Sequence, residues 1–290
     1  MLFPGKENTC AIIVTYEPSD SVCRLLIALQ DQLPSVILVD NNSSEGNLSK
    51  LSPFTDSSSV ELHKNNENIG LGAALNQAVS LAISRGFKWV VMLDQDTSIH
   101  EDFFESLIGI YTLSEGEYPL IGCNYRDISK KKNFIEPDNF KKSFIERRTV
   151  ITSGTLMRLD LFISIGCFRA DYFIDSIDHE YCLRARSAGF SVAISTKVLM
   201  SHTIGSTESK KCRWLAFDHP PIRKYYMVRN TLGTVREYLI REPLWAIRQI
   251  FRLLVEFLSI LLFECNKKAK ILAFCKGVID AISNRMGSLD

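Results

Sequence analysis

Two carboxylates stand one residue apart where an apolar run of the chain ends. Residues 89–93 are all apolar, and Asp94, Gln95 and Asp96 follow directly. Such a run predicts a strand that is buried on both faces, and open α/β sheets bind ligands beyond the carboxyl ends of their strands. Two carboxylates there are suitable ligands for Mg²⁺ or Mn²⁺, with substrate phosphates completing the coordination. An ordinary turn would also favour Asp, so the rest of the sequence must decide between a turn and a metal site.

The exits of three other expected strands carry groups that can contact a nucleotide. We expect strands at residues 10–16, 36–39 and 60–63, with helices at 20–32 and 71–86. This alternation predicts right-handed βαβ units and a parallel sheet, so the strand exits should meet at one edge. Asp40 can accept from a pyrimidine N–H or a ribose hydroxyl, and Gly70 permits close backbone approach. The polar exits are Thr15 with Tyr16, Asp40 with Asn41, and Asn68 with Gly70. Residues that simply favour loops would explain each polar exit singly, but four polar exits in succession favour a nucleotide site.

The second half of the chain offers a candidate catalytic carboxylate. Asp178 stands near the start of an expected helix, where it could cap the helix, act as a general base, or both. Glu180 and Arg184 are spaced as an i,i+4 ion pair. Ser153 and Gly154 interrupt an expected strand at 149–157, and a strand glycine often marks close approach of a ligand or another backbone. The basic stretch 126–148 is a solvated loop or a flap over an anionic substrate.

Composition excludes several classes of protein. The 290 residues carry a formal net charge of +1, which gives no reason to expect nucleic acid. The eight cysteines contain no Cys-X-X-Cys pair, so a zinc site is not expected. The N-terminus has no signal-peptide pattern and no uncharged run reaches the length of a membrane span, so we expect a cytoplasmic protein.

The C-terminal segment has a different pattern from the rest of the chain. Residues 243–265 place Arg248, Arg252 and Glu256 on a narrow stripe and apolar residues on a wide face, and a shorter amphipathic helix follows at 271–282. Such helices can pack on the catalytic domain or on a second copy of the chain. They can also lie in a membrane interface, with the basic residues near anionic lipid. The breadth of the apolar face and its basic flanks favour the membrane.

Taken together, these motifs make the chain resemble glycosyltransferase family 2, the inverting GT-A transferases that use nucleotide-sugars, and in particular the bacterial rhamnosyltransferases. The resemblance runs from about residue 10 to 230. It is carried by Val14-Thr15-Tyr16, Asp40-Asn41, the run from Asn68 to Asn76, Asp94-Gln95-Asp96, Ser153-Gly154-Thr155, Asp178-X-Glu180, His202, and the run from Tyr225 to Asn230.

The resemblance implies a fold and a set of domains. It implies a GT-A α/β domain over residues 1–240, Rossmann-like, with a mainly parallel sheet and flanking helices, followed by C-terminal amphipathic helices over residues 241–290. Residues 1–98 would form the nucleotide-binding half, and residues 99–240 the acceptor and catalytic half.

The resemblance also implies residue roles. Asp178 would be the base, although Ile177 stands where many members carry Glu, which makes Asp175 the rival. Asp96, Asp94 and His202 would reach Mg²⁺ or Mn²⁺. The implied donor-binding residues are Thr15, Tyr16, Asp40, Asn41, Asn68, Gly70, Asp94, Gln95, Ser153, Gly154 and Arg229.

The implied reaction moves L-rhamnose from dTDP-L-rhamnose onto a glycan or lipid-linked glycan in cell-surface polysaccharide (O-antigen) biosynthesis. The enzyme would lie peripherally on the cytoplasmic face of the inner membrane, with a homodimer through the C-terminal helices as the other fate of that segment. The alternatives are another donor, such as a UDP-hexose, or a non-catalytic scaffold that binds nucleotide-sugars.

Overall fold

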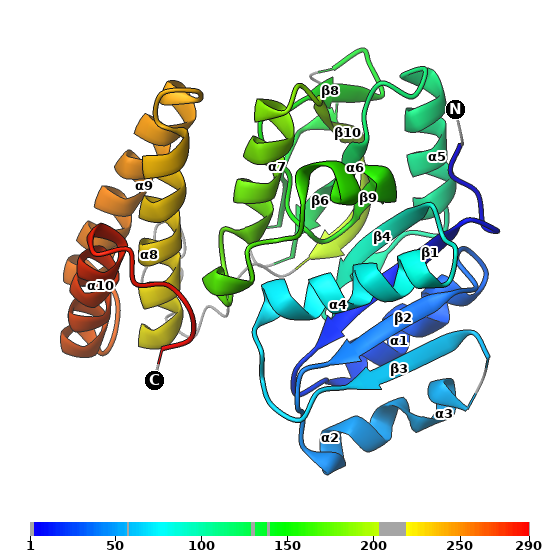
Figure 1. Ribbon diagram of the computed structural model, residues 1–290, viewed down its shortest axis with the longest axis horizontal. Helices are drawn as coiled ribbons and strands as arrows, with labels where there is room; N and C mark the ends of the chain where they lie inside the picture. Colours follow the sequence, from blue (N-terminus) through cyan, green and yellow to red (C-terminus); the bar gives the residue numbers. More distant parts are fainter. Residues whose placement is uncertain (1–2, 57, 129–130, 138–139, 203–218, 290) are drawn as a thin grey trace.

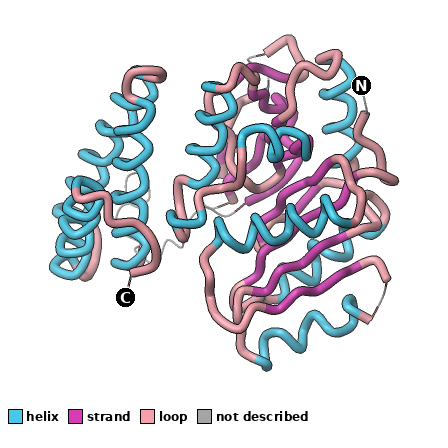
Figure 2. The backbone as a smooth tube through the Cα atoms, viewed as in Figure 1, coloured by secondary structure: helices cyan, strands magenta, loops and turns pink. Residues whose placement is uncertain are grey.

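A computed structural model describes residues 3–56, 58–128, 131–137, 140–202 and 219–289, with the side chain of His202 left out. Two parts are visible in Figures 1 and 2: an α/β unit built on one curved sheet, and a unit of three long helices beside it. The described strands form a single sheet with the order β3-β2-β1-β4-β9-β6-β10-β5. Outside this order, β7 pairs with β6 and β8 pairs with β10.

The first half of the sheet is parallel, as the alternating pattern predicts. Its strands are β1 (Thr9–Thr15), β2 (Val36–Asp40), β3 (Val60–Lys64) and β4 (Trp89–Asp94). Thr15 of β1 pairs with Asp40 of β2, and Val14 of β1 pairs with Asp94 of β4. The carboxyl ends of these strands therefore lie together, which confirms the expected common edge.

Apolar residues on the two faces of this sheet belong to two separate cores. Alternate residues of a strand point to opposite faces, so Ala11 and Ile13 pack with helix α1 (Asp20–Gln30), while Cys10 and Ile12 pack with helix α4 (Leu71–Ser84). Strands β1, β2 and β4 are buried on both faces, which explains why their sequences are almost continuously apolar, whereas the edge strand β3 is only partly buried. The short helices α2 (Glu45–Leu48) and α3 (Ser52–Thr55), joined by the 3₁₀ helix η1 (Ser49–Leu51), lie between β2 and β3.

The second half of the sheet is mixed, and two expected strands differ in extent. Its elements are β5 (Ser98–Ile99), α5 (Phe103–Leu113), β6 (Leu120–Asp127), β7 (Lys132–Asn133), β8 (Phe144–Glu146), β9 (Thr155–Arg158), α6 (Leu159–Ile165), η3 (Ala170–Tyr172), α7 (Ile177–Ser187) and β10 (Val192–His202). The strand expected at 149–157 begins only at Thr155, because Gly154 has a φ of +76° and turns the chain. The apolar runs after Ser191 form one irregular strand, β10, that pairs with β6.

The helical unit consists of α8 (Pro221–Tyr238), α9 (Pro243–Leu262) and α10 (Lys267–Ile282). Helix α10 packs closely on α8: a Cβ on Gly277 would lie 2.8 Å from the carbonyl oxygen of Tyr225. Helix α8 thus packs with the two C-terminal helices, and the domain boundary expected at residue 240 stays a prediction. None of the helices in the described residues combines the length and apolar character that crossing a bilayer requires.

Candidate active site

The exits of β1 and β2 form a preorganised polar edge. Thr15 Oγ1 donates to Asp40 Oδ1 over 2.9 Å, and the backbone N–H of Ser43 donates to Asp40 Oδ2 over 2.9 Å. The Asp40 side chain is buried, and Ser43 Oγ also donates to Asp40 Oδ1 over 2.5 Å, so the remaining accepting capacity of this carboxylate lies on Oδ2. Tyr16, by contrast, is half exposed at the rim of this edge.

Asn41 and Asn68 organise the loop that leads into α4. Asn41 Nδ2 donates to Asn68 Oδ1 over 2.8 Å, and Asn41 Oδ1 accepts from the N–H of Ile69 over 3.1 Å. The N–H of Gly70 donates to Asn68 Oδ1 over 3.0 Å. Gly70 has a φ of +83°, a conformation that few other residues adopt without strain. The two asparagines that the sequence indicated are thus brought together and shape this edge.

The turn Asp94-Gln95-Asp96 is tied to both neighbouring segments. Gln95 exchanges hydrogen bonds with the backbone of Tyr16, accepting over 3.1 Å and donating over 3.0 Å. Ser153 is fully buried beneath the turn, where its Oγ accepts from the N–H of Asp94 over 3.1 Å and lies 2.5 Å from Thr97 Oγ1. The structure therefore gives Ser153 a positioning task beneath the turn, and the donor contact that the resemblance implied stays a prediction.

Gly154, next to Ser153, is packed tightly against neighbouring protein atoms. A Cβ at this position would lie 2.7 Å from Met200 Sδ and 2.8 Å from the Cβ of Cys123, and its N–H donates to the Met92 carbonyl over 2.8 Å. Close approach of protein atoms, and not of a ligand, accounts for this glycine.

The donor set at the turn fits a divalent cation. Asp96 is exposed and Asp94 partly exposed, so two hard carboxylate ligands stand at the sheet edge. Among the described residues, no group of three His, Cys, Asp or Glu side chains gathers to hold a metal. Phosphates and waters would have to supply the remaining positions, as is usual for Mg²⁺. The side chain of His202, the third implied ligand, lies outside the described residues.

A strained segment lies between the sheet and the helical unit. Phe173, Asp175 and Ser176 all have φ between +63° and +66°, in the left-handed region that residues other than glycine rarely adopt. Phe173 is held on both sides: its carbonyl accepts from the N–H of Leu71 over 2.6 Å, and its ring stacks on Tyr226 with 5.2 Å between centroids. Strain of this kind persists only where surrounding contacts enforce it, and it gathers at functional sites.

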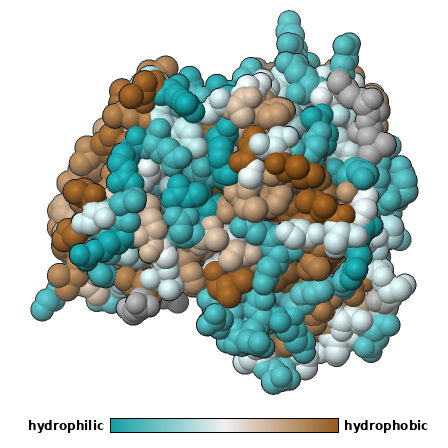
Figure 3. Space-filling model, in the orientation of Figure 1, coloured by the Kyte–Doolittle hydropathy of each residue, from teal (hydrophilic) through white to brown (hydrophobic). Residues whose placement is uncertain are grey.

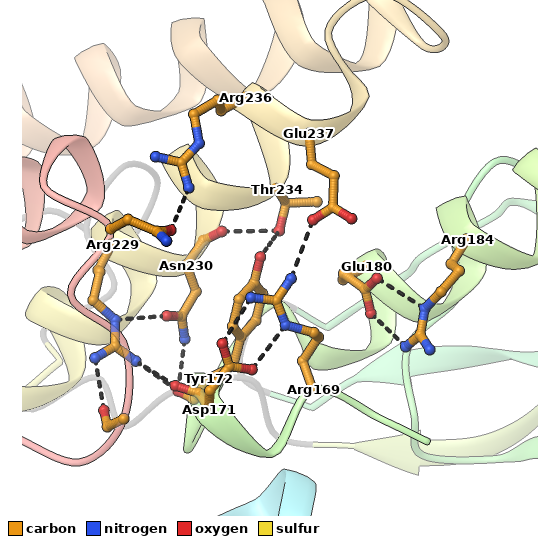
Figure 4. A network of polar contacts seen from close by, with 12 residues as sticks. Arg169, Asp171, Tyr172, Glu180, Arg184, Arg229, Asn230, Thr234, Arg236 and Glu237 are labelled. Atoms are coloured by element: carbon orange, nitrogen blue, oxygen red, sulfur yellow. Dashed lines mark hydrogen bonds and ion pairs between the residues drawn. The ribbon is translucent and has the colours of Figure 1, made fainter. Parts of the chain in front are cut away.

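Helix α8 provides those enforcing contacts through two adjacent residues (Figure 4). Asn230 Nδ2 lies within donating distance of the carbonyls of Tyr172, Ile174 and Asp175, at 2.8, 2.7 and 3.1 Å. Arg229 Nη2 donates to the carbonyls of Asp171 and Tyr172 over 3.1 Å each.

These contacts give Arg229 a structural task, and the donor contact that the resemblance implied for it stays a prediction. The residue is buried, and its Nη1 also donates to the carbonyl of Gly287 over 2.6 Å. The sequence shows a cation but not its burial, and the role of Asn230 was missed altogether. The signal that could have revealed both is an Arg-Asn pair on the buried face of a helix, where each N–H needs a partner.

Asp175 and Asp178 both line a cavity of about 1080 Å³ between the sheet and the helical unit. Asp178 Oδ1 accepts from the N–H of His179 over 2.8 Å, so the carboxylate faces the first turn of α7 without being its N-cap, which is Ser176. Asp175 Oδ1 accepts from Arg223 over 3.3 Å, whereas its buried Oδ2 has no hydrogen-bond partner. Burial raises the pKa of Asp175, and the Arg223 guanidinium opposes that shift.

Glu180 and Arg184 form the predicted ion pair on α7. Arg184 donates to both carboxylate oxygens of Glu180, over 2.9 and 2.8 Å. Glu180 is buried and also accepts from the hydroxyl of Tyr238 over 3.0 Å. The pair therefore joins α7 to α8 and is structural.

Comparison with known proteins agrees with this architecture. The family Glycosyl transferase family 2 matches residues 10–170. A dTDP-rhamnosyl transferase, RfbF of Shigella flexneri, is 28% identical over 94% of this chain and 96% of its own length. A glucosyl-dolichyl phosphate glucuronosyltransferase of Haloferax volcanii is 22% identical over 69% of this chain and 68% of its own.

Solved structures share the fold at lower identity. Residues 1–349 of TarS from S. aureus superpose with a TM-score of 0.62 at 14% identity, covering 96% of this chain and 82% of that one. The mannosyltransferase PcManGT from Pyrobaculum calidifontis gives 0.58 at 14% identity, covering 96% and 88%. The fold is thus that of GT-A transferases, and the chain belongs to glycosyltransferase family 2.

Proposed function

We propose that this glycosyltransferase moves L-rhamnose from dTDP-L-rhamnose to a hydroxyl group of a glycan or lipid-linked glycan, with inversion. The observation that carries the choice of donor is the similarity to a dTDP-rhamnosyl transferase along nearly the whole of both chains. The polar edge of Thr15, Asp40, Asn41 and Asn68 supports it, because it offers a buried carboxylate and amides to a nucleotide.

Asp178 is our candidate for the general base. The acceptor hydroxyl attacks the anomeric carbon, the bond from that carbon to the diphosphate oxygen breaks, and the hydroxyl proton passes to the carboxylate. One carboxylate acting directly inverts the anomeric configuration. Asp178 lines the cavity and accepts a single protein hydrogen bond in the described structure, so it has lone pairs for an incoming hydroxyl.

We further propose that Asp94 and Asp96 hold Mg²⁺ or Mn²⁺. A bound divalent cation would neutralise the charge that develops on the departing nucleoside diphosphate. PcManGT, which shares the fold, has been solved with GDP-Man and Mn²⁺. Gln95 would keep the turn in position through its paired bonds to Tyr16.

An exposed apolar face on the helical unit supports a proposal about where the enzyme lies in the cell. Ile247, Phe251, Leu254 and Leu258 on α9 are 54–65% exposed. We propose that this face lies on the cytoplasmic surface of the inner membrane, which would bring the cavity near a lipid-linked acceptor of O-antigen or similar polysaccharide. Dimerisation through the same face is the alternative.

A screen of nucleotide-sugars against thermal unfolding tests the donor and the metal together. A ligand at 100 times its Kd stabilises by about 2.7 kcal/mol, so a true donor raises the Tm measurably. We expect dTDP-L-rhamnose with Mg²⁺ or Mn²⁺ to give the largest rise, and Asp96→Ala to remove its metal dependence. A larger rise in Tm with a UDP-hexose would show that the donor is a UDP-hexose. Unchanged metal dependence in Asp96→Ala would show that Asp94-Gln95-Asp96 does not hold the metal.

A further inference from the structure

The cavity beside Asp178 has an unusual distribution of charge. It is closed on one side by the sheet unit and on the other by α8 and α9. Three of its arginines have carboxylate partners: Arg148 pairs with Glu242 over 2.9 Å, Arg186 with Glu146 over 3.0 Å, and Arg223 with Asp175 over 3.3 Å.

Three further arginines of the cavity have no carboxylate within ion-pair distance among the described residues. Within the described residues, Arg147, Arg248 and Arg252 make no ion pair, and Arg252 donates only to the amide oxygen of Gln249, over 3.1 Å. The cavity is also lined by five carboxylates: Glu146, Asp175 and Glu256 pair with other basic side chains, and Asp127 and Asp178 lie within ion-pair distance of none of these three arginines in the described residues. Burial and the nearby charge of Arg248 lower the pKa of Arg147. Like charges gathered in a half-closed cavity repel one another, and a bound anion would relieve that repulsion.

The same helix carries the exposed apolar face directly beside these arginines. Arg248 and Arg252 are four residues apart and so share one stripe of α9, while Ile247 and Phe251 precede them and form the adjoining stripe. Figure 3 shows hydrophobic surface along the outer side of the helical unit. A ligand in this position would meet cationic groups and an exposed apolar surface at once.

We propose that Arg147, Arg248 and Arg252 form a subsite for the phosphate or diphosphate group of the acceptor. The acceptor is a lipid-linked sugar phosphate, whose sugar hydroxyl reaches Asp178 and whose lipid runs along the apolar face of α9. Guanidinium groups suit this task because their planar fork matches phosphate oxygens. This inference rests on the proposed function and adds the residues that recognise the phosphate group of its lipid-linked acceptor.

Binding of lipid phosphates to the full-length chain tests the subsite without requiring catalysis. Farnesyl diphosphate serves as the probe, with farnesol and inorganic pyrophosphate as comparisons, and calorimetry is done with saturating dTDP present. We expect farnesyl diphosphate to bind beside dTDP and to weaken about tenfold or more in Arg248→Gln/Arg252→Gln, the size of a lost charge-assisted hydrogen bond. The matched control is Arg148→Gln, whose arginine already has a carboxylate partner; it should bind like the wild type.

Each outcome has a defined meaning. Unchanged affinity in the double variant with an unchanged Tm, or loss of the probe when dTDP is added, would overturn the subsite. Equal affinity for farnesol would overturn the arginine contacts, and equal affinity for pyrophosphate would overturn the lipid contact. Probe binding by a chain that binds no nucleotide-sugar would contradict the proposed function and leave the subsite standing.

Discussion

The sheet unit and the helical unit distribute polar and apolar residues in opposite ways. In the sheet unit β1, β2 and β4 are apolar between their ends, and polar side chains gather at their carboxyl ends. In the helical unit Lys224, Glu264 and Lys270 are almost completely buried, while large apolar residues of α9 face outward. The first unit is arranged as a self-sufficient core, whereas the second has apolar surface available for another molecule. The strained segment with Asp175 and Asp178 lies where the two units meet.

The largest effect on stability should come from breaking the buried ion network of the helices. Lys224 pairs with Glu264 over 2.8 Å and also contacts Glu256, and Lys270 pairs with the other oxygen of Glu264 over 2.8 Å. Lys224→Met leaves these carboxylates partly uncompensated, which should cost about 3–5 kcal/mol of unfolding free energy in a urea titration. The control, Lys276→Met, removes a half-exposed lysine that pairs with Asp280 and should cost no more than about 1 kcal/mol. Equal costs would mean that the helices are held by something other than this network.

Loosening the strained segment should reduce catalysis more than binding. Asn230→Ala removes the amide that donates to the carbonyls of Tyr172, Ile174 and Asp175. We expect kcat to fall by about 10- to 100-fold, in line with the loss of about 1–3 kcal/mol of buried hydrogen bonding.

The dTDP affinity of Asn230→Ala should stay near that of the wild type, because the donor edge lies on the sheet unit. Steady-state kinetics and calorimetry separate the two quantities. Thr231→Ala, on the same helix, loses one side-chain hydrogen bond among the described residues, with Ser176 over 3.2 Å, and serves as the control. A loss of dTDP affinity without a change in kcat would show that α8 supports the donor site instead.

The buried carboxyl between the two units should give stability a distinct pH dependence. Burial raises the pKa of Asp175 above its ordinary value, so the folded state favours the protonated form. Stability from this group is fully present below the unfolded pKa and is lost as pH rises through the folded pKa. Asp175→Asn should therefore match the wild type at acid pH and become relatively more stable as pH rises. Parallel urea titrations at several pH values check this, and a difference that shrinks with rising pH would contradict it.

The smallest effect on stability should come from the outward face of α9. Phe251 and Leu254 are 65% and 58% exposed, so Phe251→Ser/Leu254→Ser should change the unfolding free energy by about 0.5 kcal/mol or less. The wild type should sediment with anionic liposomes, and this binding should weaken as salt rises. The same variant should lose the sedimentation. A wild-type chain that ignores liposomes and dimerises through this face would place the apolar surface at a subunit interface.

The common polar edge of the parallel strands could be predicted from the sequence because it rests on local patterns. Each strand is a short apolar run, and parallel connection through helices forces Thr15, Asp40 and Asp94 to one edge. The i,i+4 pair of Glu180 and Arg184 likewise depends on spacing alone.

The rest of the fold and of the candidate site depends on contacts between segments that are distant in the sequence. The antiparallel strand β9 and the turn at Gly154 are set by packing against β4 and Met200, which no local pattern records. Arg229 looks like a ligand contact in the sequence, but only the packing of α8 on the segment 171–175 shows its guanidinium turned inward. The cavity itself is formed by residues of α8 and α9 that lie opposite Asp178 and the sheet unit.

Transfer kinetics of Asp178→Asn beside Asp175→Asn test the central claim most directly. With dTDP-L-rhamnose and an acceptor, Asp178→Asn should lower kcat by about 10²–10⁴-fold, the usual contribution of a general base. Its donor affinity should stay near the wild-type value, and Asp175→Asn should have the smaller effect on kcat. If Asp175→Asn instead abolishes turnover while Asp178→Asn remains active, Asp178 is not the base and the account of the site is wrong.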